Sequence, residues 1–407
     1  MKCRVCNNHI EPFISFGDMP IANGFLLEKE FKDEYFFELA TAFCEKCFTV
    51  QLVTQPDPNL MFHDNYAFFS KTSKSMQSHF KEFANWIIAN YLKNKDPFII
   101  ELGSNDGILL ENFLNNKIRH LGVEPSANVA KVAIDNGINT EVAFFDNNFA
   151  NQALLKNGKA DAILAANVMC HIPDLNEIAK ASKKILKDDG VLIFEDPYLG
   201  DMIKKISYDQ IYDEHVYIFS AISVKNIFAY HGFELIDTLP QETHGGSMRY
   251  VLCKKGSRNV SENVSNLIKK EKNLGLDKLS TYKQFKVDCE LSKVKIKSLL
   301  KKLKNEGKKI VGYGATSKST TILNYCKIGP ELIDFISDTT PIKQNKYTPG
   351  MHIPVKPYEY FIKYNPQIAV LFAWNHRKEI ENKEKLFIKN GGKFISHISW
   401  FLLFIVQ

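Results

Sequence analysis

A turn rich in acidic and amide side chains, ELGSNDG from Glu101 to Gly107, offers the most specific chemistry in this sequence. Glu101 ends an apolar run and can hold a cationic amine, while Gly103 and Gly107 let the backbone approach a ligand closely. Ser104 and Asn105 supply further polar groups. A dinucleotide fingerprint would instead place glycines as GxGxxG and receive a pyrophosphate at a helix N-terminus. Because acidic side chains repel phosphate, the turn predicts S-adenosylmethionine, a cofactor with an amino group and a sulfonium.

A second carboxylate supports the same cofactor. Glu124 follows the apolar run HLGV, 23 positions after Glu101, near the spacing at which a carboxylate takes ribose hydroxyls. Asn167 and His171 lie in ANVMCHIPD after a further strand-like run, where side chains would meet the cofactor or the substrate. We therefore predict a methyltransferase core. An α/β turn without a ligand is the alternative for ELGSNDG, and helix-cap packing is the alternative for His171.

Two CxxC pairs lie within the first 47 residues, Cys3 with Cys6 and Cys44 with Cys47. Four thiolates at this spacing predict a tetrahedral zinc site, because disulfides would be reduced in the cytosol. All four ligands would come from the protein, which leaves no position for water, so the expected role is structural. Redox pairs are the alternative, although neither CxxC begins a helix of a thioredoxin-like unit. The single cysteines are expected to be buried apolar residues: Cys170, Cys253, Cys289 and Cys326.

Strand and helix patterns divide the chain into segments that would position these groups. Residues 1–65 hold the zinc knuckles in irregular, turn-rich sequence, and residues 66–255 alternate strands with helices. The strands predicted there are Phe98–Leu102, His120–Glu124, Ala160–Ala166, Val191–Asp196, Phe233–Leu239 and Met248–Cys253. They predict a doubly wound α/β sheet, a class I methyltransferase domain, with an antiparallel hairpin at its end.

The second half of the chain predicts a bridge and another α/β domain. Residues 256–307 are rich in lysine and have apolar residues at helical spacing, which predicts one or two exposed helices. Residues 308–407 restart the α/β pattern, with strands expected at Ile333–Ser337 and Ile368–Ala373. We expect this C-terminal domain to be Rossmann-like.

Composition sets broader limits. The chain has 407 residues, of which 45% are hydrophobic and 24% charged, as in ordinary globular proteins. Its net charge of +6 gives little support to nucleic-acid binding and modest support to an anionic substrate. The chain begins a structured motif at once, and its most apolar stretch, residues 398–406, is too short to span a bilayer. We expect a cytoplasmic protein without a membrane partner.

Taken together, the motifs resemble those of the zinc-containing C-methyltransferases that act on nucleotide-linked 4-keto-deoxysugars. The resemblance covers essentially the whole chain, and its specificity lies in the order of the motifs. These are CRVC, FGDMPIANGF, CEKC, ELGSNDG, ANVMCHIPDL, DPYLGDMI, IYDEHVYIFS, HGGSMRY, GYGATSKSTTILNY and TPGMHIPV. It implies a nucleotide-diphosphate sugar as substrate, methylated at C-3, with S-adenosylmethionine and structural zinc as cofactors.

Methylation of carbon needs a base that removes a proton alpha to the ketone. His215 titrates near neutrality and can accept that proton, and the family's base falls on it. Glu214 can set the tautomer of His215, and Tyr212 can donate to the enolate oxygen. By resemblance, Tyr66 lines the sugar site. A buried structural histidine and aromatic packing are the alternatives for these residues.

Several residues are candidates for binding the substrate. His244 precedes two glycines that allow close backbone approach, and Arg249 can take phosphate or pair elsewhere. By resemblance the C-terminal domain grips the nucleotide diphosphate, with Lys318, Lys343 and His352 as candidates. A surface position without a ligand is the alternative for each.

Two other functions stay open at this stage. One is an O-methyltransferase that acts on a sugar or small metabolite, which would need no carbon acid. The other is a zinc-bearing nucleic-acid-binding protein, which predicts a basic, aromatic-interleaved stripe on the surface. The sequence leaves open whether the protein is a monomer or a homodimer. It also leaves open which sugar and nucleotide it takes, which carbon is methylated and with what stereochemistry.

Overall fold

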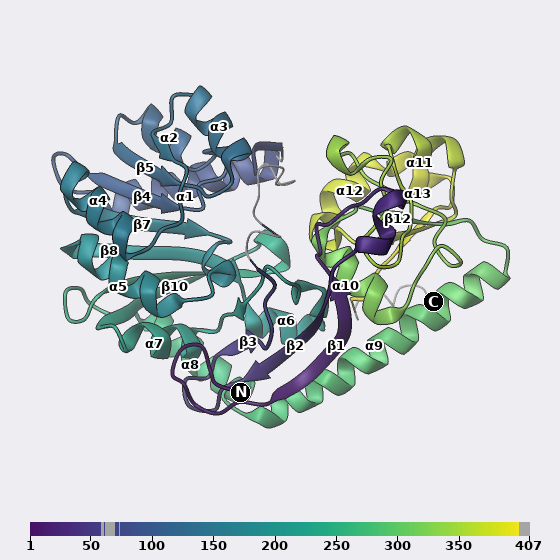
Figure 1. Cartoon of the computed structure of the whole chain (residues 1–407), viewed down its shortest axis with the longest axis horizontal. Helices are drawn as coiled ribbons and strands as arrows, with labels where there is room; N and C mark the ends of the chain where they lie inside the picture. The colour runs from purple at the N-terminus through teal and green to yellow at the C-terminus, as the bar shows by residue number, and fades with distance from the viewer. Residues whose placement is uncertain (58–60, 62–69, 73, 399–407) are drawn as a thin grey trace.

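The computed structural model describes residues 1–57, 61, 70–72 and 74–398. Strands of this part of the chain form three sheets. Two of them lie in separate lobes, and the N-terminal strands and a long helix run along the base that joins the lobes (Figure 1).

The first lobe contains a seven-stranded sheet in the order β10-β11-β8-β7-β4-β5-β6. Its strands are β4 (Phe98–Leu102), β5 (Arg119–Val123), β6 (Thr140–Glu141), β7 (Ala160–Ala166), β8 (Leu186–Pro197), β10 (Phe233–Gln241) and β11 (Ser247–Lys254). The pairs from β8 to β6 are parallel, whereas β11 is antiparallel to both of its neighbours. The predicted doubly wound sheet with a terminal hairpin is confirmed.

Both faces of this sheet are covered, which explains why its central strands are apolar along their whole length. On β4, Ile99 packs into one apolar cluster, while Phe98 and Ile100 point into another. Helices α1 and α2 contribute to the cluster of Ile99, and α4, α5 and α7 contribute to the opposite one. The helices of this lobe are α1 (Lys74–Tyr91), α2 (Leu110–Asn115), α3 (Ala127–Asp135), α4 (Asn147–Asn157), α5 (Leu175–Ile185), α6 (Leu199–Lys205) and α7 (Ala221–Ala229).

The N-terminal segment contains more regular structure than its sequence indicated. A four-stranded antiparallel sheet has the order β1-β2-β3-β9, with β1 (Pro12–Pro20), β2 (Phe36–Phe43), β3 (Val50–Leu52) and β9 (Tyr217–Ile218). The expectation of irregular sequence was wrong here, because register shifts within β1 break the alternation of buried and exposed residues. One shift lies beside Gly17, whose φ is 81°.

Two helices, α8 (Glu262–Asn273) and α9 (Leu279–Asn305), form the bridge. Although α9 is rich in lysine, one side of it is buried, and Phe285, Ile296 and Leu300 pack into a cluster shared with β1 and the C-terminal sheet. Buried Glu271 of α8 accepts hydrogen bonds from the N–H groups of Ala221 and Ile222 at the start of α7, at 2.7 and 2.8 Å. The carboxylate thereby satisfies donors that a helix N-terminus leaves unpaired.

The second lobe contains a five-stranded parallel sheet in the order β14-β13-β12-β15-β16. Its strands are β12 (Ile310–Tyr313), β13 (Ile336–Ser337), β14 (Val355–Lys356), β15 (Ile368–Leu371) and β16 (Lys393–Ile395), and its helices are α10 (Ser317–Cys326), α11 (Tyr358–Tyr364), α12 (Arg377–Lys383) and α13 (Lys385–Lys389). This order follows the Rossmann pattern that the sequence predicts. The domain boundaries predicted after residues 65, 255 and 307 remain predictions.

Candidate active site and zinc site

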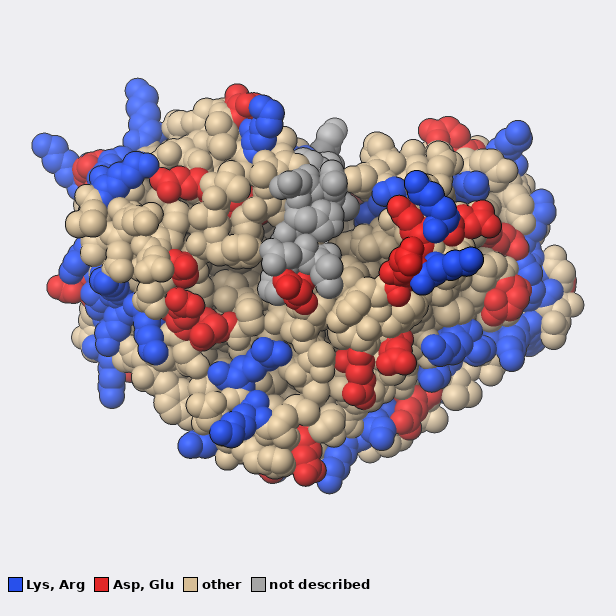
Figure 2. All heavy atoms as spheres, in the orientation of Figure 1, with Lys and Arg blue, Asp and Glu red and all other residues tan. Residues whose placement is uncertain are grey.

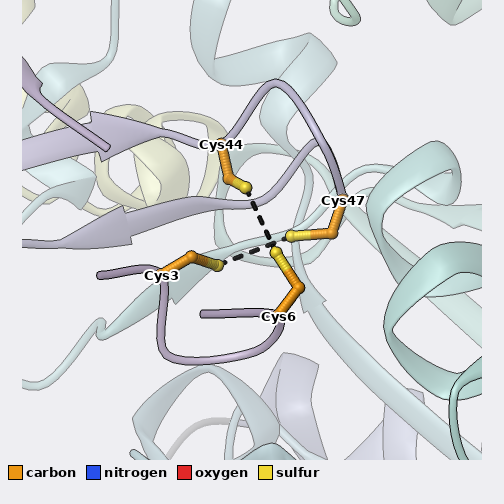
Figure 3. A group of neighbouring side chains, drawn as sticks. All are labelled: Cys3, Cys6, Cys44 and Cys47. Atoms are coloured by element: carbon orange, nitrogen blue, oxygen red, sulfur yellow. Dashed lines mark hydrogen bonds between the residues drawn. The ribbon is translucent and has the colours of Figure 1, made fainter. Parts of the chain in front are cut away.

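The four N-terminal cysteines converge from two knuckles (Figure 3). The Sγ atoms of Cys3 and Cys47 lie 3.6 Å apart, and those of Cys6 and Cys44 lie 3.5 Å apart. These separations are far longer than a disulfide bond and close to the spacing of about 3.8 Å between sulfurs in a tetrahedral zinc–thiolate site. The sulfur arrangement therefore fits zinc.

Each knuckle is closed by its own backbone. The N–H group of Asn7 donates to the carbonyl of Cys3 at 3.0 Å, and that of Phe48 donates to the carbonyl of Cys44 at 2.7 Å. Both donors have positive φ, 58° and 61°. The hydrogen bonds among the sulfurs lower the pKa of Cys3 and raise those of Cys44 and Cys47, so the sulfurs share protons that a bound metal would displace.

A cavity of about 1160 Å³ lies between the two lobes. Most of the predicted cofactor, catalytic and substrate residues line it: Gly103, Asn105, Glu124, Asn167, His171, Tyr212, Glu214, His215, His244, Lys318 and Lys343. The wall also includes residues that the sequence analysis missed, among them Asn23, Phe144, Asp338, Asn375 and His376. Such large, partly apolar cavities at domain interfaces are where small molecules bind.

On the first lobe, the cavity reaches the turn that follows β4. The Glu124 carboxylate accepts the N–H of Asn105 at 2.9 Å and that of Ser126 at 2.8 Å, so it ties this turn to the end of β5. Glu101 does not line the cavity, and its Oε2 makes no hydrogen bond within the described part of the chain. Burial and the neighbouring carboxyls of Glu124 and Asp106 raise the pKa of Glu101 well above its ordinary value. A cationic amine near Glu101 would stabilise its charged form, but Glu101 does not line the cavity, so direct contacts with S-adenosylmethionine would come from Glu124 and Asn105, which do.

The two glycines of this turn differ in their position relative to the cavity, since Gly103 lines it and Gly107 does not. Gly103 and Gly107 have φ values of 61° and 77°. A Cβ at Gly103 would lie 2.4 Å from Val168, and one at Gly107 would lie 2.2 Å from Ile138. Internal packing thus requires glycine at both positions, and close backbone approach of a ligand at Gly103 stays a prediction. Gly107 and Ser104 do not line the cavity.

The IYDEHVY segment places His215 in the wall of the same cavity that reaches the turn after β4. Nδ1 of His215 lies 2.7 Å from the carbonyl oxygen of Gln210, so Nδ1 carries the proton and donates it. In that neutral tautomer, Nε2 accepts the hydroxyl of Tyr212 at 2.8 Å. The expectation that Glu214 sets the tautomer was wrong, because the Gln210 carbonyl holds Nδ1. Burial, and the nearby ring of His171, lower the pKa of His215 well below its ordinary value and favour the base form.

Glu214 and its neighbour are held by the N-terminal segment. Nδ2 of Asn23 donates to Oε1 of Glu214 at 2.7 Å, and the N–H of Ala22 donates to Asp213 at 3.1 Å. The Ala22 carbonyl in turn accepts the hydroxyl of Thr320 from the second lobe at 2.8 Å. The turn that follows β1 thus contacts both lobes beside the cavity.

On the second lobe, the cavity reaches the turn between β12 and α10. Lys318 donates to the carbonyl of His244 at 3.4 Å, and Lys343 donates to that of Ala315 at 2.8 Å. Burial lowers the pKa of both lysines. The Asp338 carboxylate accepts the N–H of Ala315 at 2.6 Å and that of Thr340 at 2.7 Å. These cations border the cavity at a helix N-terminus, which suits an anion.

Besides Glu101, Ser104 and Gly107, two predicted substrate-binding residues, Arg249 and His352, do not line this cavity. Buried Arg249 pairs with buried Glu195 and lies 3.8 Å from the ring centroid of Phe83, so its charge is used inside the first lobe. His352 contacts Glu34 at 2.7 Å and stacks on Phe31, where it joins the N-terminal segment to the second lobe. Tyr66 lies outside the described residues.

Comparison with known proteins agrees with this division of the chain. Residues 3–62 match a family model of a zinc binding domain, residues 74–238 a methyltransferase domain, and residues 242–399 a C-methyltransferase C-terminal domain. The C-methyltransferase NovU of Streptomyces niveus is 31% identical over 397 residues, which cover 97% of this chain and 94% of NovU. The chain therefore belongs to the C-methyltransferase family of NovU. It is an S-adenosylmethionine-dependent methyltransferase with a zinc-binding domain.

Solved methyltransferases resemble the first lobe more distantly. An S-adenosylmethionine-dependent methyltransferase from Clostridium acetobutylicum is 17% identical, with a TM-score of 0.35, over 44% of this chain and 92% of its own. Magnesium protoporphyrin IX methyltransferase from Synechocystis is 13% identical, with a TM-score of 0.34, over 44% of this chain and 79% of its own.

Among the described residues, no helix is both long enough and apolar enough to cross a bilayer. On the face drawn in Figure 2, basic and acidic side chains are interspersed.

Proposed function

We propose that this enzyme methylates C-3 of a nucleotide-diphosphate-linked 4-keto-deoxysugar through an enolate. The observation that carries the proposal is the neutral His215. It lies in the wall of a cavity that reaches both the turn after β4 and the second lobe. Carbon is a poor nucleophile unless an adjacent carbonyl lets a base remove its proton, and this site contains such a base.

His215 is the proposed base. Its Nδ1–H stays on the Gln210 carbonyl, so Nε2 can accept the proton from C-3 without a change of tautomer. As Nε2 takes the proton, the Tyr212 hydroxyl that donates to Nε2 is proposed to turn toward the ketone oxygen. Tyr212 would then stabilise the charge that develops on the enolate. His171, whose ring stacks near His215 at 5.3 Å, is the further candidate for positioning the substrate.

In this proposal, the turn after β4 binds the methyl donor. Bound S-adenosylmethionine provides an electrophilic methyl group. Glu124 and Asn105 are the proposed contacts for its ribose and amino-acid ends, and Asn167, with φ of 57°, is proposed to border it from the end of β7. Lys318 and Lys343 are proposed to bind the diphosphate of the sugar nucleotide on the opposite wall.

The decisive experiment replaces His215 with asparagine. We expect turnover to fall by on the order of 10² or more while cofactor and nucleotide-sugar binding are retained. The variant should also lose exchange of the substrate proton with deuterated water in the presence of S-adenosylhomocysteine, since exchange needs the base but no methyl donor. His231→Asn, at a half-buried histidine bonded to Asn176, is the matched control. Exchange at the wild-type rate in the His215 variant would exclude this base, and Tyr212→Phe should have a smaller effect.

The substrate class needs a separate test. A thermal-shift screen of nucleotides and nucleotide sugars, with S-adenosylhomocysteine present, should show stabilisation by the matching nucleotide. Carbon NMR of the product distinguishes C-methylation at C-3 from O-methylation. We also propose that the enzyme is cytoplasmic and that it is a monomer or a homodimer.

A further inference from the structure

A second group of metal-ligating side chains lies at the wall of the catalytic cavity. Cys170 and His171 belong to one short 3-10 helix, Met169–His171, and His215 approaches it from the IYDEHVY segment. One ligand atom from each residue lies within 4.8 Å of the others. The two imidazole rings stack with centroids 5.3 Å apart and planes 28° from parallel.

The donor set of this group differs from that of the zinc module. One sulfur and two imidazole nitrogens are borderline-soft ligands, which select zinc and its transition-metal neighbours over magnesium or calcium. Three protein ligands also leave a fourth position open, whereas the four N-terminal thiolates close their site. Because His171 and His215 line the cavity, the open position would face the substrate.

We propose that Cys170, His171 and His215 form a second, exchangeable site for a divalent transition-metal ion, and that its occupation inhibits the enzyme. Binding forms one metal–sulfur and two metal–nitrogen bonds and releases the Cys170 proton to solvent. Burial and the neighbouring Asp196 raise the pKa of that thiol, so the metal–sulfur bond must offset the cost of removing the proton. The ligand atoms must draw together to the separations of about 3.3–3.8 Å found in tetrahedral sites, which is a movement of about 1.5 Å or less. A metal ion bound to Nε2 of His215 occupies the lone pair that would otherwise accept the substrate proton.

Cobalt provides a direct test of binding. Wild-type protein with its structural zinc in place is titrated with Co²⁺, and we expect one further equivalent to bind with d–d bands and a single sulfur-to-cobalt charge-transfer band. Cys170→Ala should abolish the charge-transfer band. Cys253→Ala, at another fully buried cysteine of the same lobe, is the matched control and should retain it. Absence of the band in wild-type protein would overturn the proposal.

Inhibition provides an independent readout. Added Zn²⁺ should slow turnover, and a mild chelator that spares the closed thiolate site should restore it. We expect the inhibitory zinc concentration to rise at least tenfold in Cys170→Ala and to stay unchanged in Cys253→Ala. Equal inhibition of both variants would overturn the role of Cys170. Should Cys170→Ala fold poorly, Cys170→Ser and the cobalt spectrum of His171→Gln carry the same comparison.

The inhibitory effect rests on the proposed base, but metal binding does not. If His215 is not the base, the cobalt bands still appear and proton exchange survives in His215→Asn. If the metal site does not exist, that exchange is lost in His215→Asn while no additional cobalt binds.

Discussion

In each lobe, an acidic side chain at the end of a parallel strand is held by the same pattern of hydrogen bonds. In the first lobe, Glu124 follows β5 and accepts the N–H of Asn105, from the turn after β4, and of Ser126, two residues further on. In the second lobe, Asp338 follows β13 and accepts the N–H of Ala315, from the turn after β12, and of Thr340, again two residues further on. Each acid therefore ties the turn of a central strand to the end of its neighbour.

The charges around the two acids differ. Beside Glu124 are the further carboxyls of Glu101 and Asp106, whereas beside Asp338 is the ammonium of Lys343, and Lys318 borders the same wall. One backbone arrangement is therefore surrounded by opposite charge in the two lobes. Under the proposed function, the added carboxyls would favour the sulfonium and amine of the cofactor, and the lysines would favour phosphate.

Zinc removal should have the largest effect, and it tests whether the two sites are independent. A structural zinc contributes about 10 kcal/mol or more in small zinc domains, so Cys44→Ser should unfold the N-terminal module. Because Ala22 bonds to Asp213 and to Thr320, both ligand sites should lose affinity together. Metal analysis and calorimetry with S-adenosylhomocysteine and a nucleotide measure this. Unchanged affinity at both sites in zinc-free protein would contradict the coupling.

Glu124→Ala should affect the first lobe alone. We expect S-adenosylhomocysteine to bind about 1.5–3 kcal/mol more weakly, the range for a hydrogen bond to a charged group. Nucleotide affinity should not change. Glu124→Gln keeps an acceptor and is the control, and thermal melts separate lost binding from lost folding. Calorimetry that gives equal cofactor affinity for the alanine variant would place the ribose contact elsewhere.

Asp338→Ala is the corresponding change in the second lobe. We expect nucleotide binding to weaken by about 1.5 kcal/mol, because the turn that carries Ala315 loses its acceptor. S-adenosylhomocysteine affinity should be retained, and Asp338→Asn should lie between the two. A loss of cofactor affinity instead would break the correspondence between the lobes.

Alanine at the two turn glycines should have the smallest effect on the choice of ligand and should lower folding stability instead. Gly103 and Gly314 have φ values of 61° and 87°, where an L-residue costs about 1–2 kcal/mol. A Cβ would lie 2.4 Å from Val168 at the first position and 2.9 Å from Ala373 at the second. Gly103→Ala should therefore lower the melting temperature more than Gly314→Ala. Gly137→Ala, with φ of 79° and nothing within 4 Å of its Cβ, is the control for backbone strain alone.

The sequence predicted buried strands well because both faces of the parallel sheets are apolar. Phe98–Leu102 and Ala160–Ala166 match β4 and β7 at both ends. Prediction was poorer for short strands. The strand predicted at Ile333–Ser337 is only two residues long in the structure, as β13. It failed for β1, where register shifts remove the two-residue alternation.

The candidate site could be predicted only where a residue type carries its own chemistry. His215 and Glu124 stand out by type and spacing, and both line the cavity. Arg249 carries a charge suited to phosphate, but its partner Glu195 is 54 positions away, and sequence does not show which cation a buried carboxylate will take. Asn23 gave no signal, because its contact with Glu214 joins residues 191 positions apart.

The short strand β9 limits how freely the N-terminal module could have moved among proteins. Its residues Tyr217 and Ile218 complete the sheet that β1, β2 and β3 begin, although they lie some 165 positions later than Val50 and Gln51, with which they pair. A gene fragment that ends near residue 65 would leave β3 as an open edge, exposed to pairing with other chains. Recombination at that point would separate a strand from its sheet, so the module and the segment that carries His215 are expected to be inherited together.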